Sequence, residues 1–147
     1  MKRIAFMLFV FFLTQSSFSQ VSRGNDSPPP DLIQEFKKSF PDADAVRWNM
    51  NRRGYSASFF QNGYSMKAYF SEEGEWQSTM INIPRTQVPK DAIYHYEDNY
   101  PRYRITDTAY HDAFGNSYYC LFVSNGSSRK ELHYDDNGNF VRSVNLR

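Results

Sequence analysis

Two segments of the chain place apolar side chains at the spacing of an amphipathic helix. In residues 32–41, Ile33, Phe36 and Phe40 recur every three or four positions, with polar side chains between them. This spacing predicts a helix that buries one face. Pro41, which has no backbone N–H to donate, ends it. The same arrangement recurs 60 residues later, in residues 92–101, at Ile93, Tyr96, Tyr100 and Pro101.

After each helical segment, apolar and polar residues alternate, as is typical of half-buried strands. Asn62 and Gly63 lie between two such runs and are a strong signal for a tight hairpin. Gly74 and Gly138 mark further turns. The expected strands are residues 45–50, 55–61, 64–71 and 75–83, followed by 102–112, 117–124, 129–134 and 139–146.

The two halves of the chain also resemble each other. Residues 55–63 (YSASFFQNG) align with residues 118–126 (YYCLFVSNG). Residues 68–76 (AYFSEEGEW) align with residues 132–140 (LHYDDNGNF). A period of this length indicates a repeated supersecondary unit.

The predicted fold class is therefore α+β, with two tandem helix-plus-antiparallel-sheet repeats at residues 31–84 and 89–146. Each repeat is expected to hold about four strands, with its helix packed on one sheet face. Because side chains alternate across a strand, one face of each sheet can be assigned to the helix. The side chains assigned to this face include Tyr55, Ala57 and Phe59, with Tyr118, Cys120 and Phe122 as their counterparts.

The opposite sheet face is more apolar than a solvated face needs to be. Packing of one repeat on the other would explain this, and so would a recognition surface, since exposed aromatic patches mark partner sites. The sequence leaves both explanations open. For a recognition surface, the expected partner-binding residues are Phe60, Tyr69, Ile81, Tyr119 and Leu121.

The first twenty residues have the three parts of a secretory signal peptide. Lys2 and Arg3 begin it, an unbroken apolar run follows, and small residues precede an expected cleavage site near Gln20. The apolar run, residues 4–13, is much shorter than the roughly 20 residues needed to span a bilayer. We therefore expect an exported protein that is not inserted in the membrane after cleavage.

The residues that follow refine this picture. Residues 21–30 are polar and rich in proline, so we expect a flexible leader before a domain at residues 31–146. Cys120 is the only cysteine, so no lipidated cysteine follows the signal peptide and no internal disulfide can form. The expected location is the periplasm or the extracellular space.

Charge and composition exclude some partners. Without Lys2 and Arg3, 15 basic side chains stand against 16 acidic ones. A near-neutral chain lacks the electrostatic footprint of a nucleic-acid-binding protein. Aromatic residues make up 18% of the sequence, enough to build a core and to supply binding surfaces.

The candidate chemistry is sparse. The stretch HYDDNGNF could begin a calcium loop, but counting from Asp135, Gly138 falls at position four instead of six, and Leu146 takes the place of the ligating glutamate. We interpret it as a hairpin turn. The three histidines have no zinc-ligand spacing, and no catalytic motif is present. The sequence thus predicts no catalytic, cofactor-binding or metal-binding residues, and no enzymatic activity.

The stretch FKKSFPDADAVRW, followed by YSASFFQNG, KAYFSEEGEW and IYHYEDNYP, resembles the PepSY-like domains described as beta-lactamase-inhibitor-like. These are small exported bacterial proteins, and the likeness covers about residues 31–146. The resemblance implies tandem helix-plus-four-strand units whose sheets form a concave protein-binding face, and it implies no catalytic residues.

From these observations we expect a non-enzymatic exported module, inhibitor-like in fold, that recognises a protein or peptide of the cell envelope through a sheet face. The alternative is an envelope protein that binds a small ligand or glycan on tyrosine platforms. No cofactor is expected in either case.

Overall fold

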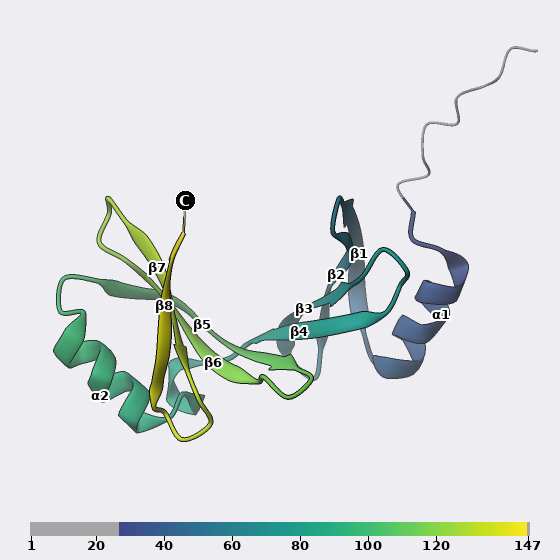
Figure 1. The fold of residues 1–147 in the computed structure, drawn as a ribbon. Helices are drawn as coiled ribbons and strands as arrows, with labels where there is room; N and C mark the ends of the chain where they lie inside the picture. Colours follow the sequence, from purple (N-terminus) through teal and green to yellow (C-terminus); the bar gives the residue numbers. More distant parts are fainter. Residues whose placement is uncertain (1–26, 147) are drawn as a thin grey trace, which may run out of the picture.

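The computed structural model describes residues 27–146, which fold into eight strands and two short α-helices (Figure 1). The predicted signal peptide and most of the predicted leader lie outside the described residues. Within residues 27–146, no helix is both long and apolar enough to cross a membrane. The elements are α1 (Pro30–Ser39), β1 (Asp44–Asn51), β2 (Gly54–Gln61), β3 (Tyr64–Phe70), β4 (Trp76–Asn82), η1 (Arg85–Gln87), α2 (Lys90–Asn99), β5 (Arg104–Ala113), β6 (Tyr118–Ser124), β7 (Arg129–Tyr134) and β8 (Phe140–Leu146).

These bounds confirm the helices and strands that the hydrophobic pattern predicts, to within two residues at each end. The helix ends follow from local chemistry. In α1, Pro30 occupies the first turn, where its missing N–H costs nothing, and Asp31 lies at the positive end of the helix dipole. Lys37 and Lys38 occupy the last turn, at the negative end.

The prediction of two separate helix-plus-sheet repeats is wrong. All eight strands form one antiparallel sheet in the order β1 to β8. The joining pair is β4 with β5, in register from Ser78 opposite Ala113 to Asn82 opposite Ala109. The alternation of apolar and polar residues within a strand does not indicate which strands pair across a long connection. Two separate sheets would leave two more unpaired strand edges than one continuous sheet does. Pairing β4 with β5 satisfies the backbone groups of both edges.

Both helices pack on the same face of this sheet, which we call the helix face. Helix α1 covers the half that includes β2 and β3, where Phe36 meets Phe59 and Phe70 with ring centroids 5.0 and 6.4 Å apart. Helix α2 covers the other half through Ala92 and Tyr96. The register runs unbroken between the halves, since Ile81 of β4 lies opposite Tyr110 of β5.

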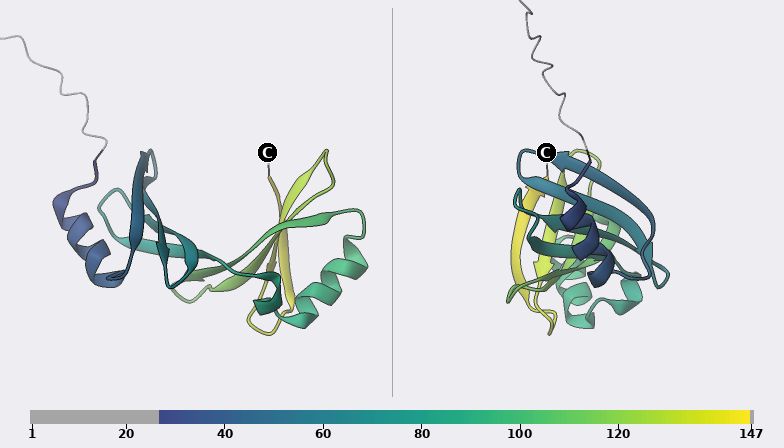
Figure 2. Two further views of the ribbon diagram at one scale, coloured as in Figure 1. Left: turned by 180° about the vertical axis from the view of Figure 1, so that it is seen from behind. Right: turned by 90° about the vertical axis from the view of Figure 1, so that its right-hand side faces the viewer.

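The other face, which we call the helix-free face, carries neither helix. Figures 1 and 2 show that the sheet bends along its strand order, so that β1–β2 and β7–β8 rise on either side of β4 and β5. The helices lie on the outside of this bend. The helix-free face therefore lines the inside of a concave sheet.

In β6 the predicted assignment of faces is wrong. Leu121 and Val123 pack in the cluster under α2, whereas Cys120 points to the helix-free face. The alignment of the two halves of the chain matched Cys120 with Ala57. In the structure, the residue of the second half that lies beneath its helix as Ala57 does is Leu121, one position later. A slip of one residue moves every side chain of a strand to the other face.

The turn at HYDDNGNF is confirmed as a hairpin turn. The carboxylate of Asp135 accepts hydrogen bonds from the backbone N–H groups of Asn137 and Asn139, at 2.9 and 2.8 Å. Gly138 has a positive φ of 85°, and a Cβ there would lie 2.9 Å from the backbone nitrogen of Ala92. The glycine therefore adopts the positive φ that the turn requires and, having no Cβ, allows the turn to approach the start of α2 closely.

Candidate functional site

The residues predicted to bind a partner do not share one face. Phe60 and Tyr69 lie on the helix-free face, since they alternate with side chains packed under α1, and Phe60 is 55% exposed. Ile81 and Tyr119 lie on the helix face and line a pocket between the two halves. Leu121 is 0% exposed beneath α2, so it lies in the core and not on the sheet face to which it was assigned. The reason is the one-residue slip in β6.

The centre of the helix-free face holds an aromatic stack from three adjacent strands. The ring of Tyr118 on β6 lies between His111 of β5 and His133 of β7. The centroid distances are 4.6 Å to His111 and 4.2 Å to His133, and the Tyr118 and His133 rings are nearly parallel at 16°. The His111 ring is tilted by 40° against Tyr118. Rings packed in this way across three strands give this part of the surface a fixed shape.

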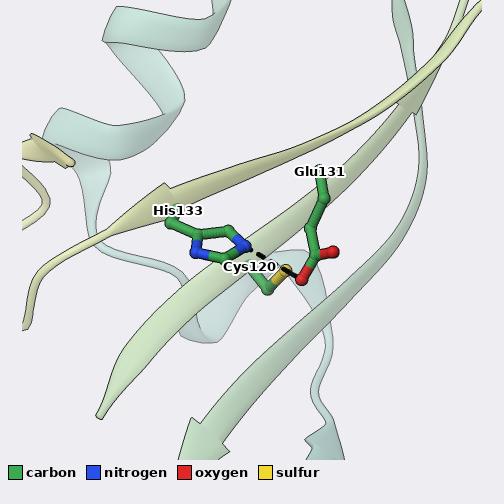
Figure 3. A group of neighbouring side chains, drawn as sticks. All are labelled: Cys120, Glu131 and His133. Carbon is green, nitrogen blue, oxygen red and sulfur yellow. Dashed lines mark hydrogen bonds and ion pairs between the residues drawn. The ribbon is translucent and has the colours of Figure 1, made fainter. Parts of the chain in front are cut away.

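Next to the stack lies a polar cluster of Cys120, Glu131 and His133 (Figure 3). The thiol of Cys120 donates to Oε1 of Glu131 at 2.8 Å. Nε2 of His133 lies 2.9 Å from the same oxygen, at an angle outside good hydrogen-bond geometry, so this contact is mainly electrostatic. Oε1 of Glu131 therefore contacts both Cys120 and His133. Cys120 and His133 are buried, and Glu131 is half-buried.

Arg142 on β8 completes this arrangement. Its Nε donates a hydrogen bond to Nδ1 of His133 at 3.0 Å. Because Nδ1 accepts this bond, the ring proton of the neutral imidazole belongs on Nε2, which faces Glu131. A chain of polar contacts therefore runs from Arg142 through His133 to Glu131. The Cys120 thiol donates its hydrogen bond to the same Glu131 carboxylate.

The electrostatics fit this assignment. The contact with His133 lowers the pKa of Glu131, so the carboxylate is ionised at neutral pH. Burial, assisted by the bond to Glu131, strongly raises the pKa of Cys120. The pKa of Tyr69 is also raised, chiefly by burial and further by the charge of Glu131. Cys120 is therefore a neutral thiol that donates a hydrogen bond, and not a thiolate nucleophile.

The same three side chains could be considered as metal ligands, since their donor atoms lie within 4.8 Å of one another. A metal-bound imidazole presents a lone pair to the metal and donates its other N–H to an acceptor. Here the atom facing Nδ1 of His133 is a donor, Nε of Arg142. This places the proton on Nε2, the nitrogen that would have to bind the metal. The cluster is thus built for hydrogen bonding and does not fit a metal centre.

A second candidate surface lies on the helix face between α1 and α2. It is a pocket of about 360 Å³ lined mainly by apolar and aromatic side chains. The rings of Tyr110 and Tyr119 meet at its floor with centroids 5.0 Å apart. At its edge, the side-chain amide of Gln87 donates to the hydroxyl of Tyr64 at 2.8 Å. Ile81 and Ile83 supply aliphatic walls.

The sequence did not predict the cluster of Cys120, Glu131 and His133. One signal was present, because Glu131 and His133 are two residues apart and must share a face of their strand. Cys120 was assigned to the opposite face, which hid the third member. Arg142 is brought to His133 only by the pairing of β7 with β8, in which the two residues lie opposite each other.

Comparisons with known proteins agree with this fold. The sequence profile of the family described as "Putative beta-lactamase-inhibitor-like, PepSY-like" matches residues 53–142. A search of curated proteins finds no match to the chain. The profile match confirms the resemblance found in the sequence.

Several solved structures from Bacteroides are similar. A DUF2874 family protein from Bacteroides uniformis has a TM-score of 0.73 at 21% identity, with 81% of this chain and 90% of that chain covered. A BLIP-like protein from Bacteroides fragilis has a TM-score of 0.70 at 18% identity, covering 82% and 88%. A structure from Bacteroides eggerthii described as "putative periplasmic proteins" has a TM-score of 0.73 at 17% identity, covering 82% and 90%. At these identities the likeness establishes a shared fold.

Proposed function

Because the chain belongs to the PepSY-like, beta-lactamase-inhibitor-like family, we propose that it is a non-enzymatic binding module of the bacterial cell envelope. In this proposal it recognises a protein or peptide through the helix-free face of its sheet. The single observation that carries the proposal is that this concave face has neither helix over it (Figure 2).

The single sheet bears on the two explanations that the sequence left open. Had the chain formed two sheets, one could have covered the apolar face of the other. In one continuous sheet with both helices on the helix face, the described residues supply no second layer for the helix-free face. Side chains such as Phe60 and Tyr69 are thus available to a partner, as aromatic residues at interfaces commonly are.

A periplasmic location supports this reading. The Bacteroides eggerthii neighbour is described as periplasmic, and the first twenty residues have the pattern of a signal peptide. A neutral, buried thiol in place of an activated nucleophile favours binding over catalysis.

Site-specific photo-crosslinking tests the proposal. A photoreactive amino acid is placed at Phe60 or Tyr69 on the helix-free face, or at Tyr94 on α2, which is 60% exposed and serves as the control. We expect ultraviolet light to join the envelope partner from Phe60 and Tyr69 but not from Tyr94. Equal crosslinking from all three positions, or crosslinking from Tyr94 alone, would contradict the proposal.

The pocket on the helix face favours a second candidate function, the binding of a small ligand or glycan. Apolar walls with a few convergent polar groups are typical of ligand sites, and Tyr110 and Tyr119 supply aromatic platforms. A thermal-shift screen with sugars and cell-wall fragments tests it, since a bound ligand raises the unfolding temperature. Ile81→Trp fills the pocket and should abolish any shift. A shift that survives in this variant would place the ligand elsewhere.

A further inference from the structure

Arg142 occupies an unusual position on the helix-free face. It is exposed on the edge strand β8, yet its side chain is tied down by the bond from Nε to the buried Nδ1 of His133. A guanidinium has five N–H donors in a planar fork. The bond to His133 uses one of them, and the Tyr118 hydroxyl engages another. Among residues 27–146, no carboxylate forms an ion pair with Arg142.

The residues behind Arg142 hold it in one orientation. His133 is fixed between Arg142, the stacked ring of Tyr118 and the carboxylate of Glu131. Glu131 is fixed in turn by the buried thiol of Cys120 (Figure 3). An arginine that is already oriented loses less conformational freedom on binding, which increases the affinity it contributes.

A hollow of about 590 Å³ opens beside this arginine on the helix-free face. Its walls include His111, Ser117 and Tyr118. The one carboxylate on its lining, that of Asp135, already accepts hydrogen bonds from Asn137 and Asn139 within the turn. The hollow thus presents aromatic surface and hydrogen-bonding side chains around a guanidinium.

The rest of the face carries the same sign of charge. Strand pairing places basic side chains on it from five strands, and the acidic ones are fewer. The basic residues are Arg47, Lys67, Arg104, Arg129 and Arg142, and the acidic ones are Asp44, Asp107 and Glu131. Glu131 is half-buried and engaged by His133 and Cys120, so the positive charge dominates the exposed surface. A near-neutral chain therefore has one cationic concave face.

We propose that Arg142 is the anchor for a carboxylate of an acidic peptide segment that lies in this hollow. The inference rests on the proposed function and names the chemistry of its partner. A carboxylate accepts two parallel hydrogen bonds from a guanidinium, which is among the strongest polar contacts available at an interface. Arginines held in this way are common centres of binding energy.

Fluorescence anisotropy with defined peptides tests the proposal. The probes are a labelled peptide of alternating Glu and Val, a matched peptide with Gln in place of Glu, and another with Lys. We expect the Glu peptide alone to bind. Arg142→Gln should weaken its binding about tenfold or more, whereas Arg47→Gln, which removes a charge from the same face, should weaken it less than about threefold.

Three results would contradict the proposal that Arg142 is the anchor. The first is equal binding of the Glu and Gln peptides, and the second is an equal loss in Arg142→Gln and Arg47→Gln, which would indicate only general attraction of charges. Arg142→Lys keeps the charge and loses the planar fork, so an unchanged affinity in this variant would also contradict the proposal. If Arg142→Gln fails to fold in thermal unfolding, Arg142→Lys decides the outcome.

Failure of the anchor can be told apart from failure of the binding face. The crosslinks from Phe60 and Tyr69 are repeated in the Arg142→Gln protein. If the envelope partner is captured with undiminished yield, the face binds its partner without the anchor. If the unmodified chain gives no crosslink from either position, the proposed function itself fails.

Discussion

The thiol of Cys120 lies 2.8 Å from Oε1 of Glu131 and donates a hydrogen bond to that carboxylate. A cysteine in this setting is a small buried side chain with a weak donor, not a reactive group. The residue was predicted to be buried, and it is, but on the helix-free side of the sheet and not beneath a helix.

The first prediction concerns this thiol. Because Cys120 is 0% exposed and burial strongly raises its pKa, a thiol-reactive dye should not label the native protein at neutral pH. Full labelling should follow on unfolding in denaturant. Rapid labelling of the folded chain, at the rate of a free cysteine, would contradict the buried hydrogen-bonded arrangement.

A second prediction concerns acid. The pKa of Glu131 is lowered in the folded state from its ordinary value of 4.5, so its stabilising effect is fully present above pH 4.5. The effect is lost as the pH falls through the lower folded value. Glu131→Gln should reduce the free energy of unfolding at neutral pH, and this difference from the unmodified chain should shrink in acid. Urea titrations across this range measure it, and a difference that stays constant with pH would disprove the role given to the carboxylate.

A third prediction separates two residues that the sequence placed on one surface. Leu121 is 0% exposed and Phe60 is 55% exposed. Leu121→Ala should lower the free energy of unfolding by about 2–5 kcal/mol, because it removes buried methyl groups and leaves a cavity. Phe60→Ala should cost only a fraction of that amount. Denaturant unfolding of both variants provides the comparison, and equal costs would contradict the face assignment of β6.

The turn that ends at Gly138 supports a fourth prediction. Gly138 and Gly126 have similar positive φ values, 85° and 92°. A Cβ at Gly126 meets nothing within 4 Å, whereas one at Gly138 lies 2.9 Å from both the Ala92 nitrogen and the Pro89 side chain. Both alanine variants bear the backbone strain of about 1 kcal/mol. Gly138→Ala should therefore lower the unfolding temperature by clearly more than Gly126→Ala, and the opposite order would exclude close packing of this turn on α2.

A fifth prediction addresses the joined sheet. Ser78 and Ala113 lie opposite each other across β4 and β5, while Arg104 lies near the other end of β5, opposite Ser124 of β6. The double variant Ser78→Cys with Ala113→Cys should form a disulfide on mild oxidation, because paired strands bring these positions within bonding reach. Ser78→Cys with Arg104→Cys serves as the off-register control and should remain reduced. Two independent sheets would leave both pairs reduced.

Much of the secondary structure followed from the sequence because its signals are local. Helical spacing around Phe36 and Tyr96, and turn glycines such as Gly63 and Gly74, placed both α-helices and the eight strands correctly, whereas η1 carried no such signal. Pairing between β4 and β5 could not be found in this way, because it depends on contacts between residues far apart in the chain. The sequence could therefore predict the elements of the fold but not their union in one sheet.

The candidate site was harder to predict for a related reason. Its members come from β6, β7 and β8, so a one-residue error in the register of β6 was enough to separate Cys120 from Glu131 and His133. Arg142 carried no sequence signal, since an exposed arginine on a strand is ordinary. Only the pairing of β7 with β8 shows that it contacts His133.

The central claim is that the helix-free face binds the partner, and one comparison of affinities tests it most directly. Once crosslinking has identified the envelope partner, its affinity is measured for Tyr69→Glu on the helix-free face and for Tyr110→Glu in the pocket of the helix face. The account predicts that Tyr69→Glu abolishes the complex and that Tyr110→Glu leaves its affinity unchanged. Loss of binding in Tyr110→Glu with normal binding in Tyr69→Glu would contradict it.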